Sequence, residues 1–192
     1  MIEDCKEKTD EELVKIILED QNYFACLIQH YQGRLLNYAR KITNLPDTEI
    51  EDILQDVFIK IYKNLNNFNP DLKFSSWIYR ITHNHIISNF RKINARPKTV
   101  SIGIDDNFLE NIASDMDTGK YVDIGYLREN INKILDKLDL KYKEVLVLKF
   151  LENKNYNEIS DILKKPIGTV GTLINRAKAK FKKELIDNNI KF

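Results

Sequence analysis

Histidine, the side chain most often used for acid–base catalysis and metal binding, is scarce and poorly spaced for either role. His83 and His85 are two residues apart in a segment with helical periodicity, so their side chains diverge, and His30 stands alone. The sequence contains no HExxH, GxSxG or glycine-rich phosphate motif. We therefore expect a protein that is not an enzyme and that needs neither a metal nor a cofactor.

Cationic and hydrogen-bonding side chains are concentrated instead in the last helical segment, about 167–186, where no acid occurs between Asp161 and Glu184. On a helix in the major groove, Thr and Asn reach base edges, and Lys or Arg neutralise phosphates. A short helical segment and a turn at 164–168 precede it, which is the order of a helix-turn-helix motif. Charge alone does not distinguish a DNA-binding helix from a solvated lysine-rich face. The order of the segments favours duplex DNA binding.

A second cluster mixes aromatic and cationic side chains around the turn at 68–73 and the helix after it. Its members are Phe68, Lys73, Phe74, Trp77, Tyr79, Arg80, Phe90, Arg91 and Lys92. Aromatic faces stack on unpaired bases while cations follow the backbone, so this pattern suits single-stranded nucleic acid. Aromatic stripes are more often core, however. We expect Trp77, Ile81 and Phe90 to be mostly buried and only some of the remaining rings to be accessible.

An acidic cluster lies at the start of another helical segment. It comprises Glu49, Glu51, Asp52, Gln55 and Asp56, and Asp52 and Asp56 share one face around Gln55. Such a patch suits the docking of a basic partner helix. Acids also favour the N-terminal half of any helix, and that interpretation is equally open from the residues alone.

The elements that position these residues are all predicted to be helices, because apolar residues recur at three- and four-residue spacing and Gly and Pro are few. Thr9 caps a helix that ends near Glu19, and Asp47 or Thr48 caps a later one. The expected helices span about 9–19, 24–42, 48–65, 75–90, 127–138, 140–151, 156–163 and 167–186.

Charge divides the chain into three parts. Residues through Lys98 carry 14 basic and 14 acidic side chains, residues 99–127 carry +1 − 6 = −5, and the rest carries 15 − 9 = +6. We expect an all-α protein with two small helical domains. A four-helix domain at 1–98 is joined by an acidic flexible linker at 99–126 to a helix-turn-helix domain at 127–192.

The two cysteines and the N-terminus bear on the cellular compartment. Cys5 and Cys26 are too few for a disulfide scaffold and lack the paired spacing of zinc or thiol redox motifs, so a reducing compartment fits best. The N-terminus is acidic where a signal peptide begins with basic residues, and no segment approaches ~20 uncharged apolar residues. We expect a cytoplasmic protein without membrane insertion.

Four motifs occur in order along nearly the whole chain: DILQDVFIK at 52–60, FSSWIYRI at 74–81, YNEI at 156–159 and GTV at 168–170. Together they resemble bacterial RNA polymerase sigma factors of the extracytoplasmic-function (ECF) class of the sigma-70 family. The resemblance implies a sigma2-like and a sigma4-like domain. It also implies a transcription initiation factor that binds core RNA polymerase, directs it to specific promoters and helps melt DNA at the start site.

The resemblance assigns roles to residues. The clamp coiled coil of core polymerase would be bound by Asp52, Gln55 and Asp56, with Phe58 supporting them. The flap of core polymerase would be a second contact of the protein. Minus-ten DNA would meet Phe68, Lys73, Phe74, Trp77, Arg80, Asn84, Arg91 and Lys92, with Arg96 on adjacent phosphate. Minus-thirty-five DNA would meet Thr169, Thr172, Asn175, Arg176, Lys178 and Lys180. The acidic linker would lie in the channel through which the polymerase passes RNA. The resemblance also implies an anti-sigma factor as a possible further partner.

The chain departs from the family pattern just after Gly-Thr-Val, where a basic residue, a Ser or Thr and an Arg are usual. Here Gly171, Thr172 and Leu173 follow, so two cations are missing, and a Gly within a helix costs about 1 kcal/mol relative to Ala. Two other functions remain as alternatives, and the missing cations bear on the second of them. One is a helix-turn-helix regulator that acts without polymerase, and the other is a sigma-like decoy.

Overall fold

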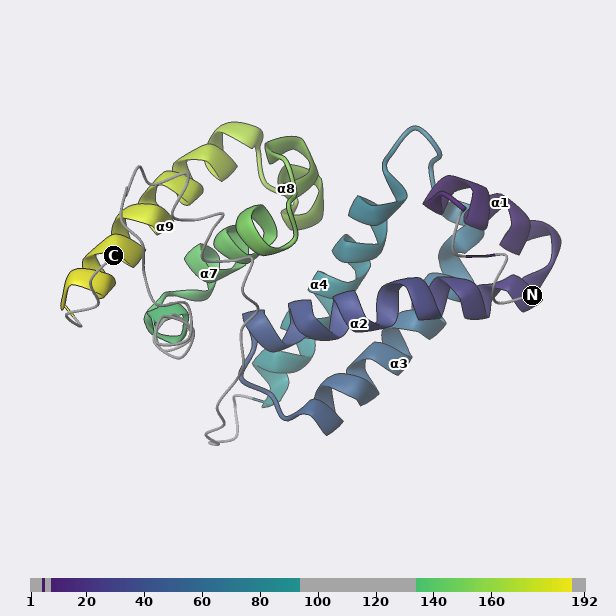
Figure 1. The fold of residues 1–192 in the computed structure, drawn as a ribbon, viewed down its shortest axis with the longest axis horizontal. Coiled ribbons are helices and arrows are strands. Elements are labelled where there is room, and N and C mark those ends of the chain that lie inside the picture. The colour runs from purple at the N-terminus through teal and green to yellow at the C-terminus, as the bar shows by residue number, and fades with distance from the viewer. Residues whose placement is uncertain (1–4, 6–7, 94–133, 188–192) are drawn as a thin grey trace. The chain divides into compact units, whose positions relative to one another are not determined.

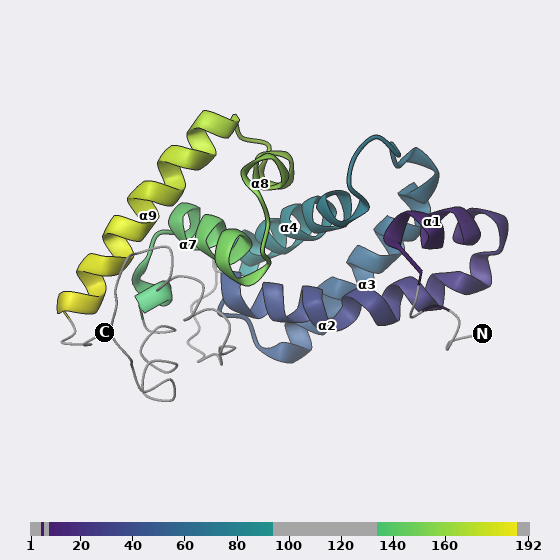
Figure 2. The same ribbon diagram turned by 45° about the horizontal axis from the view of Figure 1, so that its top comes forward.

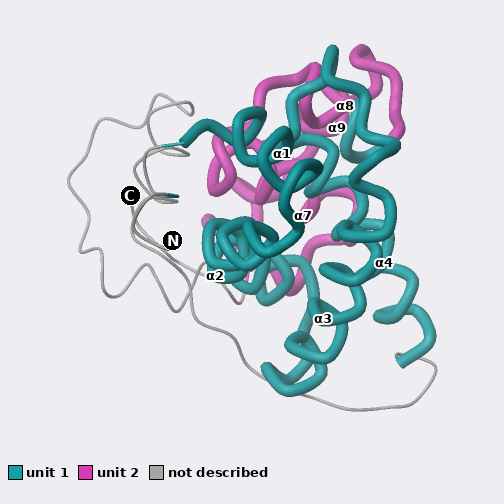
Figure 3. Tube along the Cα trace, turned by 90° about the vertical axis from the view of Figure 1, so that its right-hand side faces the viewer, with its two compact units in different colours: residues 1–100, 161–163 teal, residues 101–160, 164–192 magenta. Residues whose placement is uncertain are grey.

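The computed structural model describes residue 5, residues 8–93 and residues 134–187 (Figure 1). The chain divides into two compact units, Met1–Val100 with Asp161–Leu163, and Ser101–Ser160 with Lys164–Phe192 (Figure 3). Every regular element among the described residues is a helix or a helical turn, which confirms the predicted all-α class. The predicted acidic linker at 99–126 lies outside the described residues.

The first unit is built from four helices, α1 (Asp10–Glu19), α2 (Phe24–Ile42), α3 (Asp47–Asn64) and α4 (Phe74–Ile93). Short 3₁₀ turns at Gln21–Tyr23 and Leu65–Asn67 precede α2 and follow α3. Helix α3 packs against both α2 and α4, and α2 and α3 lie side by side (Figure 2). The fully buried core includes Leu27, Tyr31, Leu35, Val57, Ile61 and Ile78. Burial of these amphipathic faces, more than local propensity, holds the bundle together.

Local side-chain capping explains where α1 begins but not where α3 begins. The Thr9 hydroxyl accepts from the Glu12 backbone N–H at 3.3 Å, and the Glu12 carboxylate accepts from the Thr9 N–H at 2.8 Å, a complete capping box. The N-cap of α3, by contrast, is Pro46, so the expectation that Asp47 or Thr48 caps this helix was wrong. Asp47 is the first helical residue instead, and Arg40 holds it through two hydrogen bonds of 2.8 and 2.7 Å.

The two cysteines are joined, which their number and spacing did not predict. Cys5 and Cys26 form a disulfide with their Cα atoms 5.9 Å apart across a sequence separation of 21. Cys5 precedes α1 in sequence but lies next to the first turn of α2, where Cys26 stands. Sequence spacing alone does not predict this disulfide, because the approach of the two cysteines depends on how α1 packs.

The second unit contains α7 (Leu140–Leu146), which continues into the π-helical turn Val147–Leu151, and α9 (Ile167–Asp187). Helix α8 (Tyr156–Leu163) belongs to the second unit through Ser160, and its last three residues are grouped with the first. The buried face of α9, which packs on α7, consists of Val170, Ile174, Ala177, Phe181 and Leu185. Asn155 and Glu158 form a capping box at the start of α8. Lys164 ends α8 in the left-handed conformation, with φ 53°. Most of the helix expected at 127–138 lies outside the described residues.

Candidate functional site

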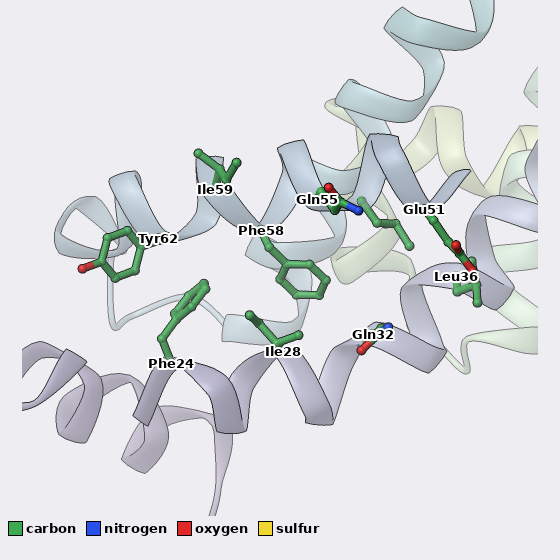
Figure 4. A pocket seen from close by; sticks show the side chains of 10 residues that line it. Phe24, Ile28, Gln32, Leu36, Glu51, Gln55, Phe58, Ile59 and Tyr62 are labelled. Atoms are coloured by element: carbon green, nitrogen blue, oxygen red, sulfur yellow. The ribbon is translucent and has the colours of Figure 1, made fainter. Parts of the chain in front are cut away.

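An apolar groove runs between α2 and α3 (Figure 4). Its cavity volume is about 580 Å³, and it is lined by Phe24, Ile28, Gln32, Leu36, Glu51, Leu54, Gln55, Phe58, Ile59 and Tyr62. Ile59 and Tyr62 are 51% and 41% exposed, although both are large apolar side chains. Exposed apolar side chains gathered in one groove are typical of a protein-binding surface. The sequence analysis did not identify this groove.

The predicted docking residues all lie on α3, and two of them line this groove. Gln55 is exposed and lines the groove, and Phe58, only 7% exposed, forms part of its floor (Figure 4). Asp52 and Asp56 are exposed on the same helix but do not line the groove. We call Asp52, Gln55 and Asp56 the acidic rim. The structure thus brings negative charge and apolar surface together on α3.

A second, polar pocket lies between α3 and α4. It has a volume of about 490 Å³ and is lined by Lys60, Asn64, Asn67, Trp77, Ile81, Asn84, His85 and Ser88. Of the residues predicted to meet minus-ten DNA, Trp77 and Asn84 line this polar pocket. Asparagine amides both donate and accept hydrogen bonds, so the pocket wall has the chemistry to pair with the edge of a base. The other amides on its wall were not singled out by the sequence analysis.

His85 connects the polar pocket to the acidic rim. Its Nδ1 lies 2.6 Å from the Lys60 ammonium, and its Nε2 lies 3.6 Å from a carboxylate oxygen of Asp56. Burial, followed by the Lys60 charge, lowers the pKa of His85 below its ordinary value, although Asp56 acts in the opposite direction. The neutral imidazole therefore accepts from Lys60 at Nδ1 and carries its proton on Nε2, facing Asp56.

The burial of Trp77 agrees with expectation, and of the three rings of which only some were expected to be accessible, Phe68 is the accessible one. Phe74 and Tyr79 are fully buried, and Trp77 is 6% exposed. Phe68 is half-buried, with its ring centroid 5.1 Å from that of Phe74 and 5.5 Å from that of Trp77. Phe74 is fully buried with its ring edge-on to that of Phe68, so in this structure it offers no surface to a base.

The other residues of the aromatic and cationic cluster agree with expectation only in part. Ile81 and Phe90 are half-buried rather than mostly buried. Three cations assigned to minus-ten DNA, Lys73, Arg91 and Lys92, are exposed, and Arg80 is half-buried. Arg96 lies outside the described residues. The cluster therefore has exposed cations just before α4 and in its last turn, and only some of its aromatic rings are partly accessible, as expected.

Most residues that were assigned to minus-thirty-five DNA lie on the outer face of α9. Thr169, Thr172, Asn175, Arg176 and Lys180 are exposed, whereas Lys178 is half-buried. The Thr172 hydroxyl donates to the Gly168 carbonyl at 2.9 Å. The Lys180 ammonium lies 3.6 Å from an Asp139 carboxylate oxygen and 4.9 Å from the centroid of the Tyr142 ring, so it is partly engaged within its own unit.

Among the described residues, no three His, Cys, Asp or Glu side chains gather as a metal site would require. Across the same residues, none of the helices has the length and apolar character to cross a membrane.

Solved structures with the same fold include CnrH in complex with the cytosolic domain of CnrY. It is 24% identical, with a TM-score of 0.66 over 93% of this chain and 97% of that one. A second is the sigma factor RpoE in complex with the anti-sigma factor NepR from Bartonella quintana. It is 18% identical, with a TM-score of 0.64 over 84% of this chain and 96% of that one.

Sequence comparisons agree with the fold. The Sigma-70 region 2 model matches residues 27–96, and the Sigma-70, region 4 model matches residues 128–181. The ECF RNA polymerase sigma factor SigW of Bacillus subtilis is 33% identical over 88% of this chain and 91% of its own length. The ECF RNA polymerase sigma-E factor of Escherichia coli is 29% identical over 95% of this chain and 94% of its own length. This chain therefore belongs to the extracytoplasmic-function class of the sigma-70 family of RNA polymerase sigma factors.

Proposed function

We propose that this protein is a dissociable initiation subunit that binds core RNA polymerase in the cytoplasm, directs it to specific promoters and helps melt the start site. It catalyses no covalent reaction. The observation that carries the proposal is the occurrence of region 2 and region 4, in order, over most of the chain. The two matched segments fall within the proposed domains 1–98 and 127–192, which supports an intervening linker at 99–126.

Core polymerase binds along α3 in this proposal. The acidic rim of Asp52, Gln55 and Asp56 attracts the basic side chains of the clamp coiled coil, and complementary charge speeds the encounter and fixes its orientation. The adjoining groove adds apolar contact through exposed Ile59 and Tyr62, which supplies affinity that surface charges alone do not. The second unit contacts the polymerase flap.

The polar pocket between α3 and α4 receives an unpaired base of the minus-ten element. Extruding a base costs a few kcal/mol, and hydrogen bonds from the pocket amides together with promoter contacts elsewhere offset that cost. Asn84 faces the base edge, and the partly accessible ring of Phe68 offers a stacking surface. Exposed Lys73, Arg91 and Lys92 hold the neighbouring phosphates.

The minus-thirty-five element binds the outer face of α9 in its major groove. Thr169, Thr172 and Asn175 have the hydrogen-bonding groups to read base edges, and Arg176 lies on the same exposed face. Lys180 contributes charge from the flank of this surface, because its ammonium also interacts with Asp139. Arg176 is accordingly the residue on which duplex affinity depends most.

An anti-sigma factor is a further proposed partner. The two solved relatives of this fold were captured with such proteins or with a cytosolic domain of another protein. A partner of this kind would bind the same groove and acidic rim that core polymerase needs, and so would compete with it.

The experiment that tests the function is run-off transcription with sigma-free core polymerase, purified protein and fragmented genomic DNA from the source organism. Discrete, protein-dependent transcript starts that share two spaced upstream elements support an initiation factor. Core binding without any start would instead indicate a decoy. Duplex binding without core binding would indicate an independent helix-turn-helix regulator.

A further inference from the structure

The disulfide between Cys5 and Cys26 has no part in the function proposed above. Its two residues are only 5% and 4% exposed, and the bond closes a loop that contains all of α1. Cys26 is the third residue of α2, two residues after Phe24 and two before Ile28, which line the groove. Since residues two apart on a helix point in different directions, the bond lies away from the groove.

A hollow leads from solvent to this bond. It has a volume of about 230 Å³ and is lined by Cys5, Cys26, Gln29 and His30. Gln29 and His30 are exposed, so the hollow opens at the surface even though the cysteines themselves are buried. A small thiolate can therefore approach the disulfide while the helices remain folded, and access of this kind governs the rate of thiol–disulfide exchange.

Helix α1 does not depend on the disulfide for its position. The capping box of Thr9 and Glu12 starts the helix, and the Tyr31 hydroxyl of α2 donates a hydrogen bond to the Asp10 carboxylate. Leu13 and Ile17 of α1 are almost completely buried. Breaking the disulfide therefore leaves α1 docked.

We propose that Cys5–Cys26 is a reversible thiol–disulfide exchange site, whose reductant is a small thiol of the glutathione class or a dithiol. A reductant thiolate attacks the Cys5 sulfur, forms a mixed disulfide and expels Cys26 as a thiolate, which takes up a proton. A second reductant thiol then attacks the mixed disulfide and releases Cys5. Two electrons pass to the protein, and the reductant leaves as its disulfide.

The position of Cys26 favours this direction of attack. In the first turn of α2 the positive end of the helix dipole stabilises a negative charge, which makes the Cys26 thiolate the better leaving group. The redox state of the site then controls whether Cys5 is tied to α2, while the groove on the other side of α2 is unchanged. This proposal does not rest on the proposed function in transcription.

The test uses the full chain equilibrated in glutathione buffers of increasing reducing strength, quenched with acid and alkylated for mass spectrometry. We expect no alkylated thiol at the oxidising end and two at the reducing end, with the transition inside the cytosolic glutathione range. Circular dichroism should show the same helix content in both states. The unfolding temperature should fall by several degrees on reduction, because the unfolded chain is no longer cross-linked. Cys5→Ser should match the reduced protein in unfolding temperature.

Access through the hollow is tested by filling its mouth. Gln29→Trp should slow reduction of the native protein by dithiothreitol several-fold without slowing it in urea. Gln32→Trp, the same change on the groove side of α2, should leave the rate unaltered. Two alkylated thiols at every glutathione ratio would overturn the proposal. So would a disulfide that dithiothreitol reduces only after the protein has unfolded, because the bond would then be purely structural.

Discussion

The ammonium of Lys60 on α3 lies 2.6 Å from Nδ1 of His85 on α4, and both side chains line the polar pocket. The other ring nitrogen of His85 lies 3.6 Å from a carboxylate oxygen of Asp56 on the acidic rim. One polar cluster therefore joins the surface proposed for polymerase to the pocket proposed for DNA. Its protonation state affects the stability of the first unit, and this makes it measurable in the isolated protein.

The stability of the first unit should depend on pH through His85. Burial and Lys60 lower the pKa of this imidazole in the folded state, so between that pKa and the unfolded value of about 6.5 the unfolded chain binds more protons. The free energy of unfolding is thus highest above pH ~6.5 and decreases as pH falls through this window. Urea unfolding at a series of pH values should show this decrease in the wild type and a smaller one in His85→Gln. Identical pH profiles in the wild type and in His85→Gln would contradict the assignment of this pH dependence to His85.

Reversing the charge of the acidic rim should abolish core binding. Asp52→Lys combined with Asp56→Lys places two cations where a basic partner docks, and like charges repel. We expect affinity for core polymerase to fall by at least about tenfold, equivalent to about 1.4 kcal/mol, in fluorescence anisotropy. Helix content should be unchanged, because both residues are exposed.

The matched control for the acidic rim is Glu11→Lys with Glu19→Lys, which makes the same change in net charge on exposed positions of α1. This control should bind core polymerase as the wild type does. Retained affinity in the Asp52 and Asp56 variant, or an equal loss in the control, would remove the docking role from α3.

The polar pocket should contribute to promoter affinity but not to polymerase affinity. Asn84→Ala removes an exposed amide from the pocket wall and should weaken holoenzyme binding to a single-stranded minus-ten oligonucleotide by about 1 kcal/mol, the value of a typical hydrogen bond. Asn22→Ala, outside the pocket, is the control. Trp77 is less informative, since its burial makes substitution destabilising. Unaltered oligonucleotide binding by the Asn84 variant would separate the pocket from DNA recognition.

Helix boundaries were predictable where the sequence carries a local signal. Thr9 with Glu12 and Asn155 with Glu158 place a cap and its partner three residues apart, and both form capping boxes. The amphipathic stripes likewise predicted α2 and α9 almost to the residue, because periodicity is a property of one helix alone.

The groove and the disulfide were not predictable in this way, because each depends on two segments. Ile59 and Tyr62 continue the apolar face of α3, and only the packing of α2 against α3 decides that they remain uncovered. Phe74 shows the same limit, since its place in a family motif did not reveal that its ring is fully buried. Cys5 and Cys26 meet only because of how α1 packs.

Duplex binding should depend on Arg176. Its side chain is exposed on the outer face of α9, so Arg176→Ala removes a cation from the DNA surface without disturbing the core. Affinity for a promoter fragment containing the minus-thirty-five element should fall by about 1–3 kcal/mol if Arg176 reads a base, while core affinity is unchanged. Lys15→Ala on α1 removes the same charge elsewhere and should have little effect. An equal loss in both variants would indicate only a general effect of net charge.

Replacing Gly171 by Ala should stabilise the second unit without weakening DNA binding. A Cβ built at this position meets the Tyr156 ring at 3.8 Å, an ordinary contact, and no described glycine has a positive φ, so Ala fits without strain. The helix propensity of Ala over Gly predicts a gain of up to about 1 kcal/mol, visible as a higher unfolding temperature. Gly33→Ala, where a Cβ meets nothing within 4 Å, is the matched change in α2. Because the added methyl faces Tyr156 of α8 rather than the exposed face with Arg176, duplex affinity should stay at the wild-type value. A marked loss of duplex affinity in Gly171→Ala would show instead that the glycine allows the α9 backbone to approach DNA closely.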